Sequence, residues 1–310
     1  MPLLENFVSL DSSQGAEVIS SALESGITYF DTAPWYGFGR SERLLGNQIR
    51  DKSHIISSKV GRLLKAGPVK DPAQFGMVDP LPFHPVYDYS YGGIMRAYED
   101  SLQRLGLEKI DILLVHDIGK FQHGEENERH FMDLKLSGYK AMAELRTAGD
   151  VKAIGLGVNE NEICLDCLEI GDWDVFLLAG RYTLLEQTPL DKLFLACDNA
   201  GTSIICGGPF NSGVLVGREM WNYKKAPKHL VEKVLDLSSI ARKFDIPLPA
   251  AALKFPLFHP IIKAVIPGAR TKAEVEQIMT WFSTDIPIDF WKELKDKGLL
   301  DARAPTGEFS

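Results

Sequence analysis

The sequence of 310 residues has few cysteines, no long apolar run and no concentration of positive charge. Its four cysteines are internal and too few for a disulfide framework, which is typical of a reducing compartment. No stretch approaches the roughly eighteen apolar residues of a membrane span, and the N-terminus lacks a basic region before an apolar core. A net charge of −8 argues against nucleic acid as a partner. We therefore expect a cytoplasmic protein that binds neither membranes nor nucleic acid and acts on a small molecule.

Two patterns have the residue types of metal or redox sites. Cys164-x-x-Cys167 lies in a helical pattern with no second cysteine pair, which favours buried thiols. His123 and His130 lie among charged residues in the polar piece 117–137, and their spacing favours a solvated loop over a metal site. We assign no metal.

The order of apolar and amphipathic segments indicates an α/β fold. The length suits one domain, residues 1–310, of the (β/α)8 type. Helical patterns at 41–50, 91–105, 138–148, 160–169 and 189–200 alternate with strand-like runs at 27–31, 54–60, 110–115, 152–157, 174–178, 202–206 and 261–266. Such alternation predicts a parallel sheet.

Residues 61–90 carry five prolines and no sustained period, which predicts a long loop at the carboxyl end of a strand. Loops at that end build the active-site face of such a barrel, so this one is a candidate substrate wall or lid, with surface padding as the alternative. The aromatic residues that could line it are Phe75, Phe83, Tyr87 and Tyr89.

Three consecutive strands end in ionisable side chains, Asp31, Lys59 and His116, and Tyr36 follows Asp31 by five residues. The carboxyl ends of parallel strands meet at one edge, so we expect these four side chains to lie together. A tyrosine that transfers protons needs its pKa lowered from about 10, and a nearby ammonium is the usual means. Taken singly, Asp31 could cap a turn, Lys59 could be solvated and His116 could be a buried, hydrogen-bonded histidine.

These residues and their context resemble the catalytic tetrad of the aldo-keto reductase family, whose members are (β/α)8 barrels. The strings at 30–34, 88–91, 101–107 and 180–185 resemble the branch that contains aldose and pyridoxal dehydrogenases. The resemblance implies that Tyr36 is the general acid or base and that Lys59 holds its pKa down. It also implies that Asp31 pairs with Lys59 and that His116 orients the substrate oxygen.

The same resemblance implies a nicotinamide cofactor, although the chain has no Gly-x-Gly-x-x-Gly fingerprint. Asn159 would hold the carboxamide, although Asn159-x-x-Glu162 is also a helix-capping pattern. The other positions implied as cofactor-binding are Gly207, Pro209, Phe210, Ile266, Gly268, Ala269, Arg270 and Glu274. The segment 207–213 could equally be a plain loop, and 266–271 would seat phosphates at a helix start.

The chain departs from the family pattern where Ala179 replaces a glutamine and Gly207 replaces an aromatic residue, so we expect the cofactor to pack differently here. Glu274 would repel a 2′-phosphate and Arg270 would attract one. We expect NAD, with NADP as the alternative. Thr271-x-x-Glu274 is also a capping box, in which Glu274 would turn back to its own helix.

The expected activity is oxidation of a small aldose of the L-fucose or L-galactose type, or of pyridoxal in its hemiacetal form, to a lactone. One alternative is a general NADPH-dependent aldehyde or ketone reductase. Another is a non-catalytic, nucleotide-sensing regulatory subunit. The sequence leaves the sugar and the oligomeric state open.

The segments contain seven strands, one fewer than a (β/α)8 barrel requires. The chain opens on a helical pattern before Gly26, and residues 2–7 resemble the segment that follows the first barrel strand of the family. We therefore expect that the N-terminal hairpin and the first barrel strand are missing, which leaves a gap between strands 27–31 and 261–266. Residues 3–8 could fill the gap, another chain could cover it, or the natural chain could start upstream of Met1.

Overall fold

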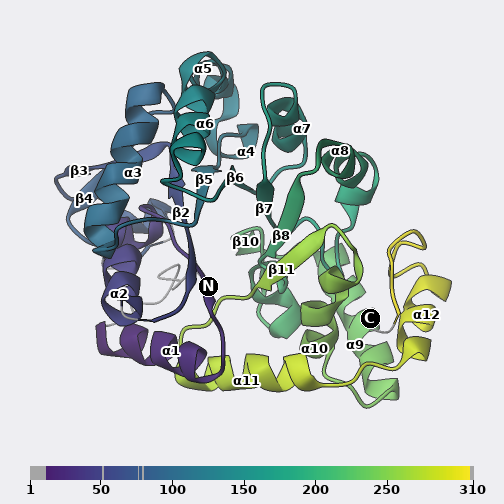
Figure 1. Cartoon of the computed structure of the whole chain (residues 1–310). Helices are drawn as coiled ribbons and strands as arrows, with labels where there is room; N and C mark the ends of the chain where they lie inside the picture. Colours follow the sequence, from purple (N-terminus) through teal and green to yellow (C-terminus); the bar gives the residue numbers. More distant parts are fainter. Residues whose placement is uncertain (1–11, 51, 76, 79, 308–310) are drawn as a thin grey trace.

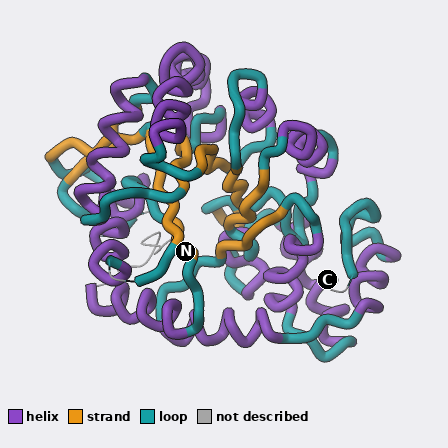
Figure 2. The backbone as a smooth tube through the Cα atoms, viewed as in Figure 1, coloured by secondary structure: helices purple, strands orange, loops and turns teal. Residues whose placement is uncertain are grey.

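The computed structural model describes residues 12–50, 52–75, 77, 78 and 80–307. Seven parallel strands form one sheet in the order β1-β2-β5-β6-β7-β8-β11. Their bounds are β1 Tyr29–Asp31, β2 Ile55–Val60, β5 Ile112–His116, β6 Ala153–Val158, β7 Val175–Ala179, β8 Ser203–Gly207 and β11 Ile262–Ile266. Figure 2 shows them as an incomplete ring with helices outside it. All seven predicted strands are confirmed.

Helices cover the outer face of this ring (Figure 1). The predicted ones are present as α1 Ser12–Glu24, α2 Arg40–Ile49, α3 Tyr91–Leu105, α6 Tyr139–Ala148, α7 Glu162–Leu168 and α8 Leu193–Ala200. The second half of the chain adds α9 Lys228–Lys243, α10 Leu248–Lys254, α11 Lys272–Ser283 and α12 Ile288–Asp296. Side-chain caps help to set two boundaries, because Ser90 accepts from Gly93 N at the start of α3 and Thr271 accepts from Glu274 N at the start of α11.

Most of the strands are buried on both faces, as is typical of parallel strands between a barrel interior and a helical shell. The exception is β11 at one end of the sheet, where Lys263 is exposed. The larger apolar cluster lies between sheet and helices, and it contains the buried thiols of Cys164 and Cys167, as predicted. A smaller cluster faces the barrel interior and comprises Leu114, Val175, Leu177, Ile205 and Ile266. Side chains from alternating positions therefore fill both sides of the sheet.

The sheet is not closed among the described residues. Strands β1 and β11 stand at its two ends, and no ladder joins them within the described part of the chain. The fold is that of a (β/α)8 barrel with one strand fewer, as predicted. The prediction that residues 3–8 fill the gap falls outside the described residues.

The structure corrects two local predictions. Residues 61–90 are not one irregular loop, because β3 Arg62–Ala66 and β4 Phe83–Tyr87 pair as an antiparallel hairpin. The hairpin was not predicted because proline is rare inside strands, and Pro85 lies within β4.

The piece 117–137 is not a solvated loop either, because it forms α4 Lys120–His123, α5 Asn127–Asp133 and the π-helical turn Leu134–Gly138. His130 is buried and its ring lies 4.3 Å from that of His123, between centroids. The rings of His123 and His130 pack against Tyr87 and Tyr89, so this segment is ordered and partly buried despite its polar composition. No helix in the described ranges is long and apolar enough to span a membrane.

Candidate active site

Asp31 and Lys59 form a buried ion pair at the carboxyl ends of β1 and β2. Lys59 Nζ lies 2.6 Å from Asp31 Oδ2, and the two side chains are only 2% and 3% exposed. Lys59 Nζ also donates to Thr32 O, and Ser57 Oγ donates to Asp31 Oδ1 at 2.6 Å. The expected pairing is confirmed, and with these additional bonds both charges are compensated.

A glycine on β6, two places from β2 in the sheet, leaves room for the Lys59 side chain. A Cβ built on Gly157 of β6 would lie 3.0 Å from Lys59 Cε and 3.3 Å from Lys59 Cδ. A larger residue at this position would push the lysine stem away from Asp31. Gly157 therefore makes space for the Lys59 side chain.

Tyr36 lies beside this pair, in the 3₁₀ turn Tyr36–Gly39. Lys59 Nζ is 4.9 Å from the centroid of its ring, and the ring centroid of His116 is 6.0 Å away at an interplanar angle of 85°. The four residues that the sequence singled out, Asp31, Tyr36, Lys59 and His116, are therefore brought together as predicted.

The expected lowering of the Tyr36 pKa is not what the surrounding charges produce. Burial raises the pKa of Tyr36 well above its ordinary value, and the negative charges of Asp31 and Asp117 raise it further, against the opposing effect of Arg62. Lys59 gives no net lowering because Asp31 neutralises its ammonium at 2.6 Å. Tyr36 is thus a protonated phenol that can donate a proton but must lose its own before it can accept one.

His116 ends β5 as a neutral imidazole. Its pKa lies well below the ordinary value because it is buried and because Arg62 and Lys59 carry positive charge nearby. Tyr89 fixes the backbone here, since its hydroxyl donates to His116 O at 2.8 Å. A neutral imidazole keeps one N–H donor, which can hold a substrate oxygen.

A cavity of about 150 Å³ opens between Tyr36 and the ends of β6, β7, β8 and β11. The predicted residues Asn159, Gly207, Ile266 and Gly268 line it together with Asp31. Its floor is made of small residues, because Ala179 lies opposite Gly207 in the ladder of β7 and β8. A Cβ on Gly207 would lie 2.9 Å from Leu177 Cδ2, so a larger residue here would displace the Leu177 side chain.

A second, larger cavity of about 490 Å³ adjoins the first. The two share Gly208, Ser212, Tyr223 and Gly268 as lining residues. The larger one is lined by the predicted residues Pro209, Phe210, Arg270 and Glu274, whereas Ala269 is fully buried and faces neither cavity. Together the two form one elongated site that runs from Tyr36 to the start of α11.

At the far end of this site Glu274 is tied to two arginines. Its carboxylate lies 2.6 Å from Arg270 Nη2 and 3.1 Å from Arg218 Nη2, and it accepts from Arg270 N at 2.7 Å. These contacts lower its pKa against the opposing effect of burial. Glu274 turns back toward the start of its own helix, as the capping pattern predicted, and it also lines the larger cavity. That it disfavours a 2′-phosphate stays a prediction.

Several site residues were missed by the sequence analysis. Arg62, Asp117 and Gln122 lie beside His116, while Asn222 and Tyr223 line the smaller cavity and Trp281 the larger. Asp117 directly follows the end of β5 and Arg62 comes two residues after the end of β2, and this position is a signal that could have found them. Tyr223 reaches the cavity from a loop with no sequence period, where its backbone has a φ of +63°.

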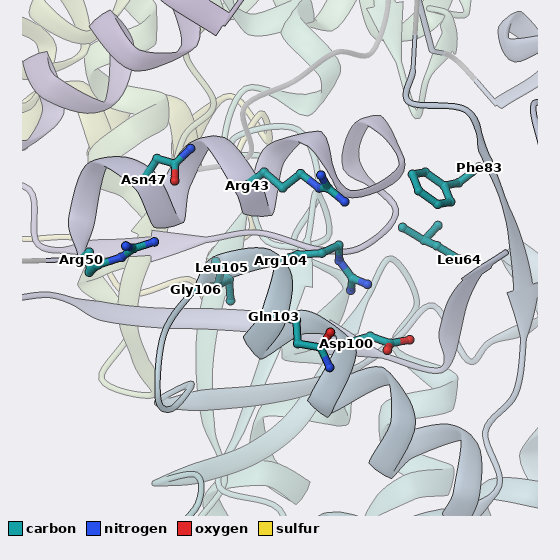
Figure 3. A pocket seen from close by; sticks show the side chains of 10 residues that line it. All are labelled: Arg43, Asn47, Arg50, Leu64, Phe83, Asp100, Gln103, Arg104, Leu105 and Gly106. Atoms are coloured by element: carbon teal, nitrogen blue, oxygen red, sulfur yellow. The ribbon is translucent and has the colours of Figure 1, made fainter. Parts of the chain in front are cut away.

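A further hollow lies away from this site. It has a volume of about 520 Å³ between α2 and α3 and is lined by Arg43, Asn47, Arg50 and Arg104, as Figure 3 shows. Phe83 lines this hollow and not the cavity beside Tyr36. Phe75 falls in a part whose side chains the structure does not describe.

Comparison with known proteins gives consistent results. The model of the aldo/keto reductase family matches residues 6–298. Pyridoxal 4-dehydrogenase of Microbacterium luteolum is 41% identical over 91% of this chain and 87% of its own length. D-threo-aldose 1-dehydrogenase of a Pseudomonas species is 34% identical over 95% of this chain and 91% of its own length. The structure of an aldo-keto reductase from Bacillus halodurans in its holo form superposes with a TM-score of 0.74 at 21% identity, covering 97% of this chain and 91% of the other, and supports the fold alone.

Proposed function

The chain belongs to the aldo/keto reductase family and is an NAD(P)-dependent oxidoreductase; from this premise we propose that it oxidises a small polar hemiacetal to a lactone with NAD. The substrate is a cyclic aldose or pyridoxal in its cyclic hemiacetal form. The observation that carries the proposal is the meeting of Tyr36, the Asp31–Lys59 pair and His116 at one end of an elongated site.

The shape and chemistry of that site suit a dinucleotide. The flat floor at Ala179 and Gly207 leaves room for an aromatic ring, and Asn159 supplies an amide at the edge of the same cavity. The larger cavity is lined by the edge-to-face pair Phe210 and Trp281, whose ring centroids are 5.7 Å apart. These rings offer an aromatic surface for the nucleotide base of the cofactor. Asn159 and the surface at Ala179 and Gly207 would hold a nicotinamide, which would supply the hydride acceptor for the oxidation.

The four residues beside the smaller cavity handle the proton and the position of the substrate. Tyr36 exchanges a proton with the reacting oxygen, as acid in reduction and, after losing its own proton, as base in oxidation. His116 donates its N–H to the same oxygen. The ion pair with Asp31 fixes the Lys59 ammonium 4.9 Å from the centroid of the Tyr36 ring.

NAD is proposed over NADP because Glu274 occupies the donors of Arg270 and Arg218 that a 2′-phosphate would need. A ribose hydroxyl can donate to a carboxylate in that setting, whereas a phosphate would have to displace it. The choice of NAD over NADP thus rests on the contacts of Glu274 at the start of α11.

Substrate profiling with L-fucose, L-galactose, D-arabinose and pyridoxal tests the activity. A cyclic hemiacetal presents one C–H and one O–H, so a lactone forms without water and should be detected by NMR and mass spectrometry before any acid. Early samples that hold only open-chain acid would refute lactone formation, and aldehyde reduction that is far faster with every compound would favour a general reductase.

A further inference from the structure

Asp117 directly follows His116 and is held in an uncommon conformation. Its φ of +43° lies in the left-handed region, which a non-glycine residue seldom adopts, although aspartate tolerates it better than most. Its backbone N–H donates to Gly157 O at 2.9 Å. The strand end is therefore bent so that the carboxylate lies beside the imidazole of His116 instead of pointing along the chain.

Three charged or polar partners surround this carboxylate. Arg62 Nη2 donates to Asp117 Oδ2 at 2.6 Å, and Asn159 Nδ2 donates to Asp117 Oδ1 at 3.2 Å. His116 Nε2 lies 3.5 Å from Oδ2. The side chain of Asp117 is 17% exposed whereas that of Arg62 is 1% exposed, so the carboxylate and not the guanidinium is open to a ligand.

Arg62 is held more firmly than a pair with Asp117 alone would require. Its guanidinium carbon lies 4.3 Å from the ring centroid of Trp35 and 5.6 Å from that of Tyr87. Gln122 accepts from Arg62 Nη2 at 3.1 Å and donates to the Tyr87 hydroxyl at 2.9 Å. A carboxylate so rigidly supported loses little freedom on binding a hydroxyl.

We propose that Asp117 is the acceptor for a substrate hydroxyl on the carbon next to the reacting one, so that the enzyme selects 2-hydroxy aldehydes and aldoses over plain aldehydes. This rests on the proposed function in placing the reacting oxygen between Tyr36 and His116. With that oxygen at the imidazole, an oxygen on the neighbouring carbon lies within reach of Oδ2, which is 3.5 Å from Nε2. Asp117 has lone pairs free for the hydroxyl proton, since the described partners use one on each oxygen.

The test compares two aldehydes that differ in one hydroxyl, lactaldehyde and propanal, in the reductive direction. In the wild-type enzyme kcat/KM should favour lactaldehyde by about tenfold to a hundredfold, the range for a hydrogen bond to a charged acceptor. Asp117→Asn should bring the ratio close to one by lowering the value for lactaldehyde. An equal loss with both aldehydes would overturn the proposal, because it would mean that Asp117 only positions His116.

Asp111→Asn is the matched control. Asp111 is also buried, accepts from Ile56 N at 2.9 Å and pairs with Lys152 at 2.9 Å, but it precedes β5 while Asp117 follows it. Its loss should change stability and leave the ratio unchanged. If Asp117→Asn does not fold, Arg62→Lys is the second variant. Lysine keeps the positive charge but lacks the planar guanidinium that supports Asp117, so the ratio should also fall. An unchanged ratio would overturn the proposal.

The proposal and the proposed function fail in different ways. If no sugar or pyridoxal is oxidised while the lactaldehyde preference and its loss in Asp117→Asn are both found, the lactone-forming activity is wrong and the role of Asp117 holds. If sugars are oxidised and 2-deoxy sugars react as well as their parents, the role of Asp117 is wrong and the activity holds.

Discussion

Replacing Lys59 by methionine should destabilise the protein far more than removal of an exposed lysine. The variant leaves the Asp31 carboxylate, 3% exposed, with Ser57 as its remaining side-chain partner among the described residues. An unpaired buried charge costs about 3–5 kcal/mol, out of a total stability of about 5–15 kcal/mol for a typical domain. Equilibrium urea unfolding measures this difference.

The double variant Asp31→Asn/Lys59→Met separates charge from packing. An asparagine at position 31 can still accept from Ser57, so no buried charge is left over. We expect the double variant to be only about 1–2 kcal/mol less stable than the wild type, and so about 2–3 kcal/mol more stable than Lys59→Met. Neither variant should turn over substrate, so the recovery of stability without activity would separate the structural role of the pair from its chemical one.

Lys243→Met is the control. Lys243 Nζ lies 2.5 Å from Glu293 Oε2, but the lysine side chain is 63% exposed. Such a pair contributes about 0–1 kcal/mol. The reasoning fails if Lys59→Met costs no more than Lys243→Met, or if the double variant is as unstable as the single one.

Four further predictions concern proton transfer, cofactor choice and pH. Tyr36→Phe should lower kcat by about 10²–10⁴ with unchanged dinucleotide affinity by fluorescence titration, and a variant that keeps a tenth of the rate would contradict the acid–base role. Because the pKa of Tyr36 is raised, kcat/KM for oxidation should climb about tenfold per pH unit with no plateau below about pH 9, and an early plateau would refute this. Glu274→Gln should free Arg270 and Arg218 and shift the kcat/KM ratio toward NADP by about tenfold, so no shift would count against the NAD proposal. Burial lowers the pKa of His123 from 6.5 to about 4 in the folded protein. Between these two pH values His123 is protonated in the unfolded chain but not in the folded one. Stability should therefore decline on acidification, by on the order of 1 kcal/mol after allowance for partial exposure, and His123→Gln should reduce this loss in urea unfolding at pH 5 and 7.

The sequence alone determined the parallel sheet, the strand positions and the residues that meet beside Tyr36. Strand order follows chain order in this fold, so an ionisable residue at a strand's carboxyl end is placed by topology. Asp31, Lys59 and His116 could therefore be brought together without coordinates. The helix cap at Thr271 is also a local pattern: Thr271 accepts from Glu274 N, and the Glu274 carboxylate accepts from Arg270 N at the start of the same helix.

Tertiary structure alone decided the electrostatics and the walls of the site. The raised pKa of Tyr36 depends on how deeply the phenol is buried and on Asp117, whose carboxylate is placed by a backbone turn and not by a sequence period. Arg62 lies beside Asp117 only because residues 62–87 fold back as a hairpin, a pairing of distant segments that Pro85 concealed. Local patterns specify strands and caps, whereas burial and the meeting of distant side chains arise only when the whole chain packs.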